Sequence, residues 1–195
     1  MSDTPVIEVP PRRMFLARSG GFALSAAAVL LLAGRDASAQ GMGGATSADV
    51  NILNVALGLE YEAINAYQLG AQSGLLQKPV LDVAVKFQSD HKGHRDALIA
   101  TIQKMGGKPV EEKKLDDYAK ALKAETLKTQ ADVLTLAAML ELGAANAYLG
   151  VIPSFKDPQL AKVAGRLAAD ETMHWTTLNG ALGRSLPADA LPFGA

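Results

Sequence analysis

Apolar residues recur at steps of three and four along four segments of the chain, which is the spacing that places side chains on one face of an α-helix. Glycine or proline bounds these segments, as at Ser73-Gly74, Gly106-Gly107 and Pro153. Thr46 and Ser47 are placed to cap the first segment, and Asp157-Pro158 opens the fourth. The pattern predicts helices at about residues 48–72, 80–105, 130–151 and 158–182.

A charged stretch, residues 108–128, separates the second and third predicted helices and reads as a solvated crossover with some helical periodicity. Helices of roughly 22–27 residues would span about 33–40 Å, the length found in four-helix bundles. The sequence therefore predicts an all-α fold: a four-helix bundle built from two helix pairs joined by a long crossover. It contains no glycine-rich phosphate loop and no nucleophile elbow.

The two helix pairs repeat one another in their polar residues. Glu60 and Glu141 are offset by 81 positions, while His94 and His174 are offset by 80. Asn65 and Tyr67 have counterparts at Asn146 and Tyr148, also offset by 81. Such a repeat indicates two similar halves that pack into one unit.

Composition narrows the function classes. The chain is 49% hydrophobic but only 5% aromatic, as expected for close-packed helices built from Ala, Leu and Val. A formal charge of −1 gives no basic surplus for nucleic-acid binding. Without cysteine, disulfides, thiolate metal sites and sulfur nucleophiles are excluded.

The first 39 residues have the features of an export signal. Arg12-Arg13 precedes a short apolar run, residues 22–33, and Ala37-Ser38-Ala39 supplies small residues for cleavage. The pattern resembles a twin-arginine signal, which implies the twin-arginine machinery as a partner and a periplasmic or otherwise exported protein cleaved near Ala39. An ordinary secretory signal or an uncleaved membrane helix are the alternatives, although the run is shorter than the roughly 20 residues that span a bilayer. No stable membrane anchor is expected.

This interpretation divides the chain into four parts. They are a signal peptide (1–39), a linker (40–46), the helical domain (47–184) and a C-terminal tail (185–195) that packs loosely across the bundle.

Three carboxylates, Glu60, Glu141 and Glu171, lie on otherwise apolar helix faces, where a charge is costly unless it is paired, protonated or bound to a metal. His91/His94 and Glu171/His174 are each three residues apart, so each pair can hold an ion from one helix. Mixed carboxylate and imidazole ligands suit iron, manganese or zinc.

A lone Glu on one helix and Glu-x-x-His on the next, given twice, is the pattern of the ferritin-like di-iron or di-manganese carboxylate bundles. The chain resembles that superfamily over about residues 47–183, and Leu59-Glu60-Tyr61-Glu62-Ala63 looks like its exported, single-bundle branch, described as ferritin-like or desiccation-related. The resemblance implies roles for seven residues. Glu60 and Glu141 would be terminal ligands, His94 and His174 imidazole ligands, Glu171 a bridging ligand, and Asp90 and Asp170 outer partners that orient the histidines.

His91 departs from that pattern, because it stands where a second bridging Glu is expected. Three carboxylates remain instead of four, so an asymmetric or mononuclear site becomes an alternative to a dinuclear one. His91 could equally be a structural histidine. Tyr67 and Tyr148 are either core residues or hydrogen-bond partners of the site, and Glu62 lies on another face of its helix.

The resemblance implies redox chemistry with O₂ or peroxide, such as Fe(II) oxidation or peroxide scavenging, with iron or manganese as the cofactor. The alternative is a non-catalytic metal carrier or stress-protective bundle with a partial or vestigial site. A manganese-catalase-like activity is a third hypothesis. The sequence leaves the substrate open, and it leaves open whether the protein forms a homo-oligomer.

Overall fold

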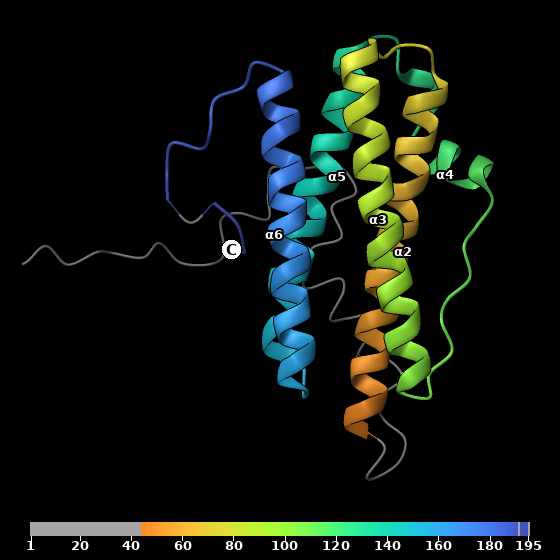
Figure 1. Ribbon diagram of the computed structural model, residues 1–195, viewed down its shortest axis with the longest axis vertical. Helices are drawn as coiled ribbons and strands as arrows, with labels where there is room; N and C mark the ends of the chain where they lie inside the picture. Colours follow the sequence, from red (N-terminus) through yellow and green to blue (C-terminus); the bar gives the residue numbers. More distant parts are fainter. Residues whose placement is uncertain (1–43, 191, 195) are drawn as a thin grey trace, which may run out of the picture.

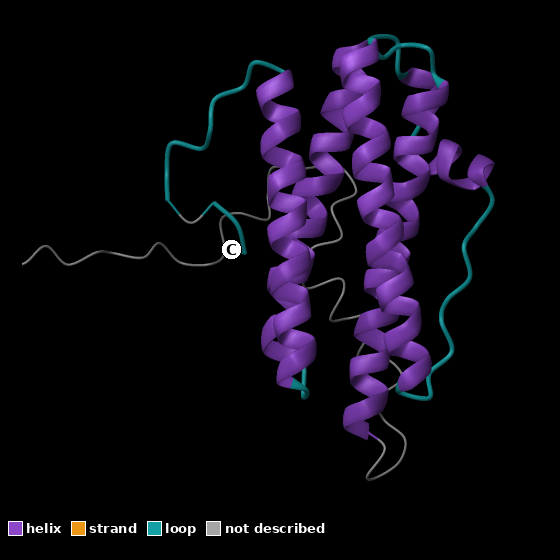
Figure 2. Ribbon diagram, in the orientation of Figure 1, coloured by secondary structure: helices purple, strands orange, loops and turns teal. Residues whose placement is uncertain are grey.

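A computed structural model describes residues 44–190 and 192–194, and the regular structure of these residues is entirely helical (Figure 2). The predicted all-α class is confirmed. The predicted export signal and residues 40–43 of the predicted linker lie outside the described residues. The long helices are α2 (Gly44–Gln72), α3 (Lys78–Lys104), α5 (Gln130–Val151) and α6 (Pro158–Ala181); the shorter elements are α4 (Leu115–Ala121), η2 (Ala124–Thr126) and η3 (Ile152–Ser154).

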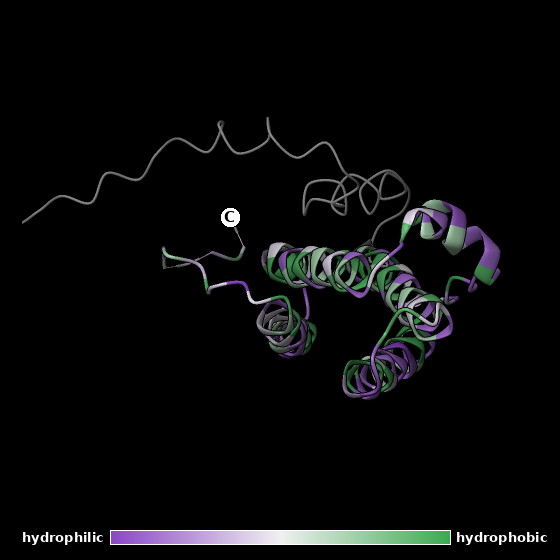
Figure 3. Ribbon diagram, turned by 90° about the horizontal axis from the view of Figure 1, so that it is seen from above, coloured by the Kyte–Doolittle hydropathy of each residue, from purple (hydrophilic) through white to green (hydrophobic). Residues whose placement is uncertain are grey.

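The four long helices run side by side (Figure 1). The most extensive packing is α5 on α6 and α2 on α3, so each half of the repeat forms a helical hairpin. The hairpins meet mainly through α2 and α5, whereas α3 and α6 touch much less. Seen from above, α4 lies outside the long helices, and it packs on α2 (Figure 3).

Local sequence explains where these helices begin. Pro79 occupies the first turn of α3, and Asp157 caps α6 through a hydrogen bond from the Gln159 amide, as its sequence predicts. Helix α5 begins with a capping box in which Thr129 and Asp132 each accept from the other's backbone amide. The helix ends are therefore encoded locally, independently of the site between them.

The prediction for the start of α2 was wrong. This helix begins at Gly44 rather than at residue 48 or 49, so Thr46 and Ser47 lie within it and do not cap it, and residues 44–46 belong to the helix rather than to a linker. Ser and Thr are tolerated in a first helical turn, and Asp49 is used elsewhere: its carboxylate accepts hydrogen bonds from the backbone of Lys156 and Asp157 (3.1 and 3.4 Å). The crossover between the halves also differs from a purely solvated segment, since Tyr118 of α4 is buried.

We expect Asp49→Ala to lower the free energy of unfolding by about 1–3 kcal/mol. The backbone amides of Lys156 and Asp157 would lose their acceptor, and Asp49 is only 2% exposed, so water could not easily replace it. Urea unfolding followed by circular dichroism measures this. Asp82→Ala is the matched control, since Asp82 forms an exposed pair with Lys78 and its loss should be undetectable. Equal midpoints for the two variants would contradict this role of Asp49.

Two apolar clusters occupy the interior at different heights. One contains Leu57, Leu98, Ile102 and Leu167, and the other is built on Leu134, Ala138 and Leu178. In α3, α5 and α6, His91, His94, Glu141, Glu171 and His174 lie between these clusters in the sequence of their helix and are buried with them. Electrostatic interactions at that level therefore act in a low-dielectric environment.

Helix α5 is the most apolar of the long helices. Residues Gln130–Ser154 are long and apolar enough to cross a membrane by length and composition. Length and composition are weak evidence for a membrane span, because a helix in the middle of a packed protein has the same composition. This helix also carries the buried Glu141.

Candidate metal centre

Six side chains that the sequence selected meet between the helices. Glu60 comes from α2, His91 and His94 from α3, Glu141 from α5, and Glu171 and His174 from α6. None is more than 9% exposed, and Glu171 is fully buried. Burial of this many ionisable groups is costly unless they are paired with one another or hold an ion.

The six side chains form two overlapping groups of potential metal ligands, each with one donor atom per residue within 4.8 Å of the others. We call them lobe A (Glu60, His91, His94 and Glu171) and lobe B (His91, Glu141, Glu171 and His174). His91 and Glu171 belong to both lobes. Glu62 belongs to neither, in agreement with its place on another helix face.

Several inward-facing atoms of the lobes make no hydrogen bond. Within residues 44–190 and 192–194, these buried atoms are His94 Nδ1, His174 Nδ1, Glu141 Oε2 and both carboxylate oxygens of Glu171. They face each other at ion-pair distances: Glu171 Oε1 is 3.3 Å from His94 Nδ1, and Oε2 is 3.4 Å from His174 Nδ1. Buried polar atoms nearly always have partners, so this convergence needs an explanation.

The outer nitrogens of the two inward-facing histidines point to carboxylates on the opposite hairpin. His94 Nε2 on α3 lies 3.2 Å from Asp170 Oδ2 on α6, and His174 Nε2 on α6 lies 3.4 Å from Asp90 Oδ2 on α3. In the neutral form of the ring, a carboxylate that accepts the Nε2 proton leaves Nδ1 with a lone pair directed into the site. Asp90 and Asp170 thus occupy the positions that the resemblance implies for them.

The two tyrosines make a second reciprocal pair of contacts. Tyr67 on α2 donates a hydrogen bond to Glu141 on α5, and Tyr148 on α5 donates one to Glu60 on α2. Both hydroxyls are buried, and burial raises the pKa of each tyrosine well above its ordinary value, with the nearby glutamates adding to the effect. Each phenol therefore stays protonated and fixes one carboxylate oxygen.

His91 lies between the lobes. Its Nδ1 is 2.8 Å from Glu60 Oε2, and its Nε2 is 3.2 Å from Glu141 Oε1. The ring stacks on Tyr67 with centroids 5.6 Å apart. Burial would lower the pKa of His91, but hydrogen bonds to Glu141 and Glu60 outweigh it and raise the pKa to about 11. In the metal-free protein His91 is thus a cation that joins two carboxylates.

The other groups show the same opposition between burial and pairing. Burial lowers the pKa values of His94 and His174. Their contacts with the glutamates outweigh burial and raise the two pKa values to about 10 and about 9. Burial raises the pKa of Glu171 to about 7. Burial acts in the same direction on Glu141, but its close contacts with His174 and His91 outweigh burial and hold the pKa of Glu141 below its usual range. The metal-free site is therefore neutralised internally by protonated histidines.

Sequence spacing did not reveal two contacts of the site. The ring of Phe87 stacks on His174 with centroids 4.0 Å apart, and Lys86 forms an ion pair with Asp90 one turn away. Phe87 stands on the apolar stripe of α3, where it could not be distinguished from an ordinary core residue. The i, i+4 spacing of Lys86 and Asp90 was the one available signal.

The sequence profile of the ferritin-like domain family matches residues 48–184, which contain every residue of both lobes. The chain belongs to the ferritin-like domain family. A solved structure with a similar fold is that of a conserved hypothetical protein, rv2844, from Mycobacterium tuberculosis, at 22% identity and a TM-score of 0.58. The match covers 77% of this chain and 99% of that one, and it concerns the fold alone. No curated protein matches the chain.

Proposed function

We propose that this ferritin-like protein binds one or two redox-active first-row metal ions, iron in the first place and manganese as the alternative, and carries out oxidation chemistry with O₂ or peroxide. The observation that carries this proposal is the convergence of five buried donor atoms, all without hydrogen-bond partners among the described residues, on one space between the helices. Carboxylate oxygens and imidazole nitrogens are the donors that these ions take.

In this proposal Glu60 and His94 hold an ion in lobe A, Glu141 and His174 hold one in lobe B, and Glu171 faces both. When bound, the metal supplies a centre that can change its oxidation state in exchange with O₂ or peroxide. Tyr148 and Tyr67 hold the outer carboxylate oxygens in place, and Asp170 and Asp90 keep the Nδ1 lone pairs of the histidines directed inward. The apolar clusters on both sides keep water from the donor atoms.

His91 makes the proposed centre asymmetric. Its two nitrogens contact different carboxylates, so turning it toward an ion in one lobe removes it from the other. A full set of four donors is then available in one lobe, while the other keeps three and an open position. Full occupancy by one ion, with weaker binding of a second, is the expected order.

A metal carrier or stress-protective protein is the second candidate, and His91 is the observation that favours it. Protonated, it neutralises Glu60 and Glu141 without any ion, so the site can persist in a metal-free state. A redox centre that must stay loaded has no need of such an internal cation.

The proposal includes export: a twin-arginine signal over residues 1–39, cleavage near Ala39, and a periplasmic, single-bundle protein of four long helices. The family match covers residues 48–184, so the proposed signal over residues 1–39 lies outside the matched domain. Intact-mass measurement of the protein recovered outside the cytoplasm tests the cleavage position, and recovery of the full-length mass there would contradict it.

We expect the protein loaded with Fe(II) to consume O₂ faster than Fe(II) in buffer, and His91→Glu to raise tightly bound iron from about one to about two ions per chain, because it restores a fourth carboxylate. Plasma emission spectrometry and an oxygen electrode measure the two quantities. Bound iron without accelerated O₂ consumption would favour the carrier. Unchanged stoichiometry in His91→Glu would show that His91 does not set the number of ions.

A further inference from the structure

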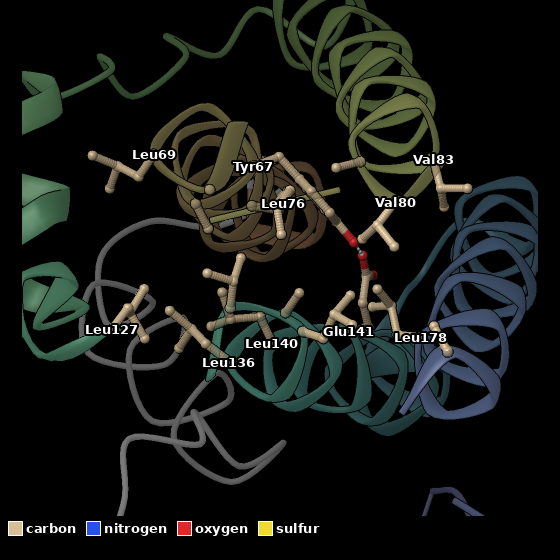
Figure 4. A pocket seen from close by; sticks show the side chains of 18 of the residues that line it. Tyr67, Leu69, Leu76, Val80, Val83, Leu127, Leu136, Leu140, Glu141 and Leu178 are labelled. Carbon is tan, nitrogen blue, oxygen red and sulfur yellow. Dashed lines mark hydrogen bonds between the residues drawn. The ribbon is translucent and has the colours of Figure 1, made fainter. Parts of the chain in front are cut away.

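A cavity of about 250 Å³ lies beside lobe B, at the end of the structure where α2 and α3 are joined. Figure 4 shows two rows of side chains facing each other across it, with Leu136, Leu140 and Leu178 on one side and Val80 and Val83 on the other. Segments η2, α2, α3, α5 and α6 all contribute to its wall. We call the space between the two rows the slot.

The wall of the cavity is aliphatic except for Tyr67, Glu141 and Thr177. Both hydroxyl hydrogens among these are already used: Tyr67 donates to Glu141, as Figure 4 shows, and Thr177 donates to the carbonyl oxygen of Met173 (2.9 Å). The polar lining thus offers no spare hydroxyl donor to a carboxylate or phosphate head group. An occupant must be held by apolar contact.

We propose that this slot binds the unbranched aliphatic chain of one small molecule, with the methyl end of the chain against the Tyr67–Glu141 pair. An apolar cavity of about 150 Å³ takes up benzene, with its six carbons, so about 250 Å³ corresponds to about ten carbon atoms. The lining offers few polar groups to hold water, which leaves the slot available to a hydrocarbon.

The inner end of the slot argues for a thin occupant. Glu141 is only 2% exposed, so whatever reaches it must pass between the two rows of aliphatic side chains. A linear aliphatic chain can enter in this way. The cavity also places the chain end next to lobe B. An aliphatic chain bound there would be the substrate of the proposed oxidation, and this part of the inference rests on the proposed function. Binding of the chain does not require a metal.

Titration of the metal-free, full-length protein with 1-decanol by isothermal calorimetry tests the binding. We expect one decanol per chain, with 1-hexanol bound more weakly, and a loss of at least about tenfold in affinity in Ala137→Phe, whose ring fills the slot. Ala131→Phe is the matched control, because Ala131 is exposed on the same helix and does not line the cavity. Its affinity for decanol should equal that of the wild type.

Leu136→Ala gives a second, independent measurement that does not depend on filling the slot. Leu136 is a half-buried lining residue, and its truncation should shift the preferred alcohol to a chain longer by about two or three carbons. No decanol binding by the wild type, or equal affinity in wild type and a folded Ala137→Phe, would overturn the proposal. The proposed metal function is separable, because Glu171→Gln should lose metal and still bind decanol.

Discussion

Glu171→Gln is expected to weaken metal binding at least about 100-fold, and the purified variant should contain almost no metal. Glu171 is the one carboxylate common to both lobes, is fully buried, and has both oxygens facing inward without hydrogen bonds among the described residues. Glutamine keeps the shape of the side chain but removes its charge and one of its two acceptor oxygens. Metal content by plasma emission spectrometry, after loading with Fe(II) or Mn(II) and gel filtration, measures the loss.

Two controls separate loss of ligation from loss of fold. Glu62→Gln changes a neighbour of Glu60 that belongs to neither lobe, and it should keep the metal content of the wild type. In the metal-free state Glu171→Gln should unfold at the same temperature as the wild type or higher at pH 8, because burial raises the pKa of Glu171 and makes its ionised form unfavourable there. Full retention of metal by Glu171→Gln would refute the proposed centre.

The second large effect is an opposite response of the metal-free and metal-loaded proteins to pH. In the metal-free fold, His91, His94 and His174 have pKa values of about 11, 10 and 9, all above the ordinary value of 6.5. A histidine whose pKa is raised by folding stabilises the fold fully below pH 6.5, and that contribution is lost as the pH rises through the folded value. The pKa of Glu171 is also raised, from 4.5 to about 7, so its contribution to stability is likewise lost as the pH rises between those two values.

The pKa values of Glu60 and Glu141 are lowered, so their contribution is present above pH 4.5 and is lost as the pH falls below it. The metal-free protein should therefore be most stable between about pH 4.5 and 6.5, and its unfolding temperature should drop by several degrees or more between pH 6 and pH 9.5. Calorimetry of the chelator-treated protein measures this drop.

Metal binding should have the reverse dependence, because an imidazole must lose its proton before it can act as a ligand. Each histidine that ligates would release about one proton, so affinity should rise by up to about tenfold per pH unit per ligating histidine between pH 6 and 8. Calorimetric titration in buffers of different ionisation enthalpy counts the protons. Metal affinity independent of pH would show that the protonated histidines are not displaced by the ion.

Spacing within the sequence predicted which side chains would meet, but not how they contact one another. The steps from His91 to His94 and from Glu171 to His174 follow from helical geometry alone, so each pair could be placed on one face in advance. Whether Tyr67 would reach Glu141, or Asp170 would reach His94, depends on how each helix is rotated about its axis toward a neighbour on the other hairpin. That rotation is set by packing of the whole interior, and no single helix encodes it.

The repeated asparagines illustrate the same limit. Asn65 and Asn146 matched in the sequence without suggesting a role. In the structure the Asn65 amide donates to Glu112, in the segment between α3 and α4, and Asn146 accepts from the backbone of Gly194 in the tail. Each holds a non-helical segment against its own hairpin. These segments have no sequence similarity, so the shared function of the two asparagines appears only once the chain is folded.

The four reciprocal contacts of the site have one property in common: each joins one hairpin to the other, and none lies within a hairpin. Sliding either hairpin by one helical turn would break all four at once and leave buried phenols and carboxylates unmatched. The buried polar contacts therefore fix the register in which the two otherwise similar, alanine-rich hairpins pack. Two similar halves of one chain could in principle pair in several registers, or each could pair with a copy of itself. The four polar contacts favour the one assembly in which the centre is complete.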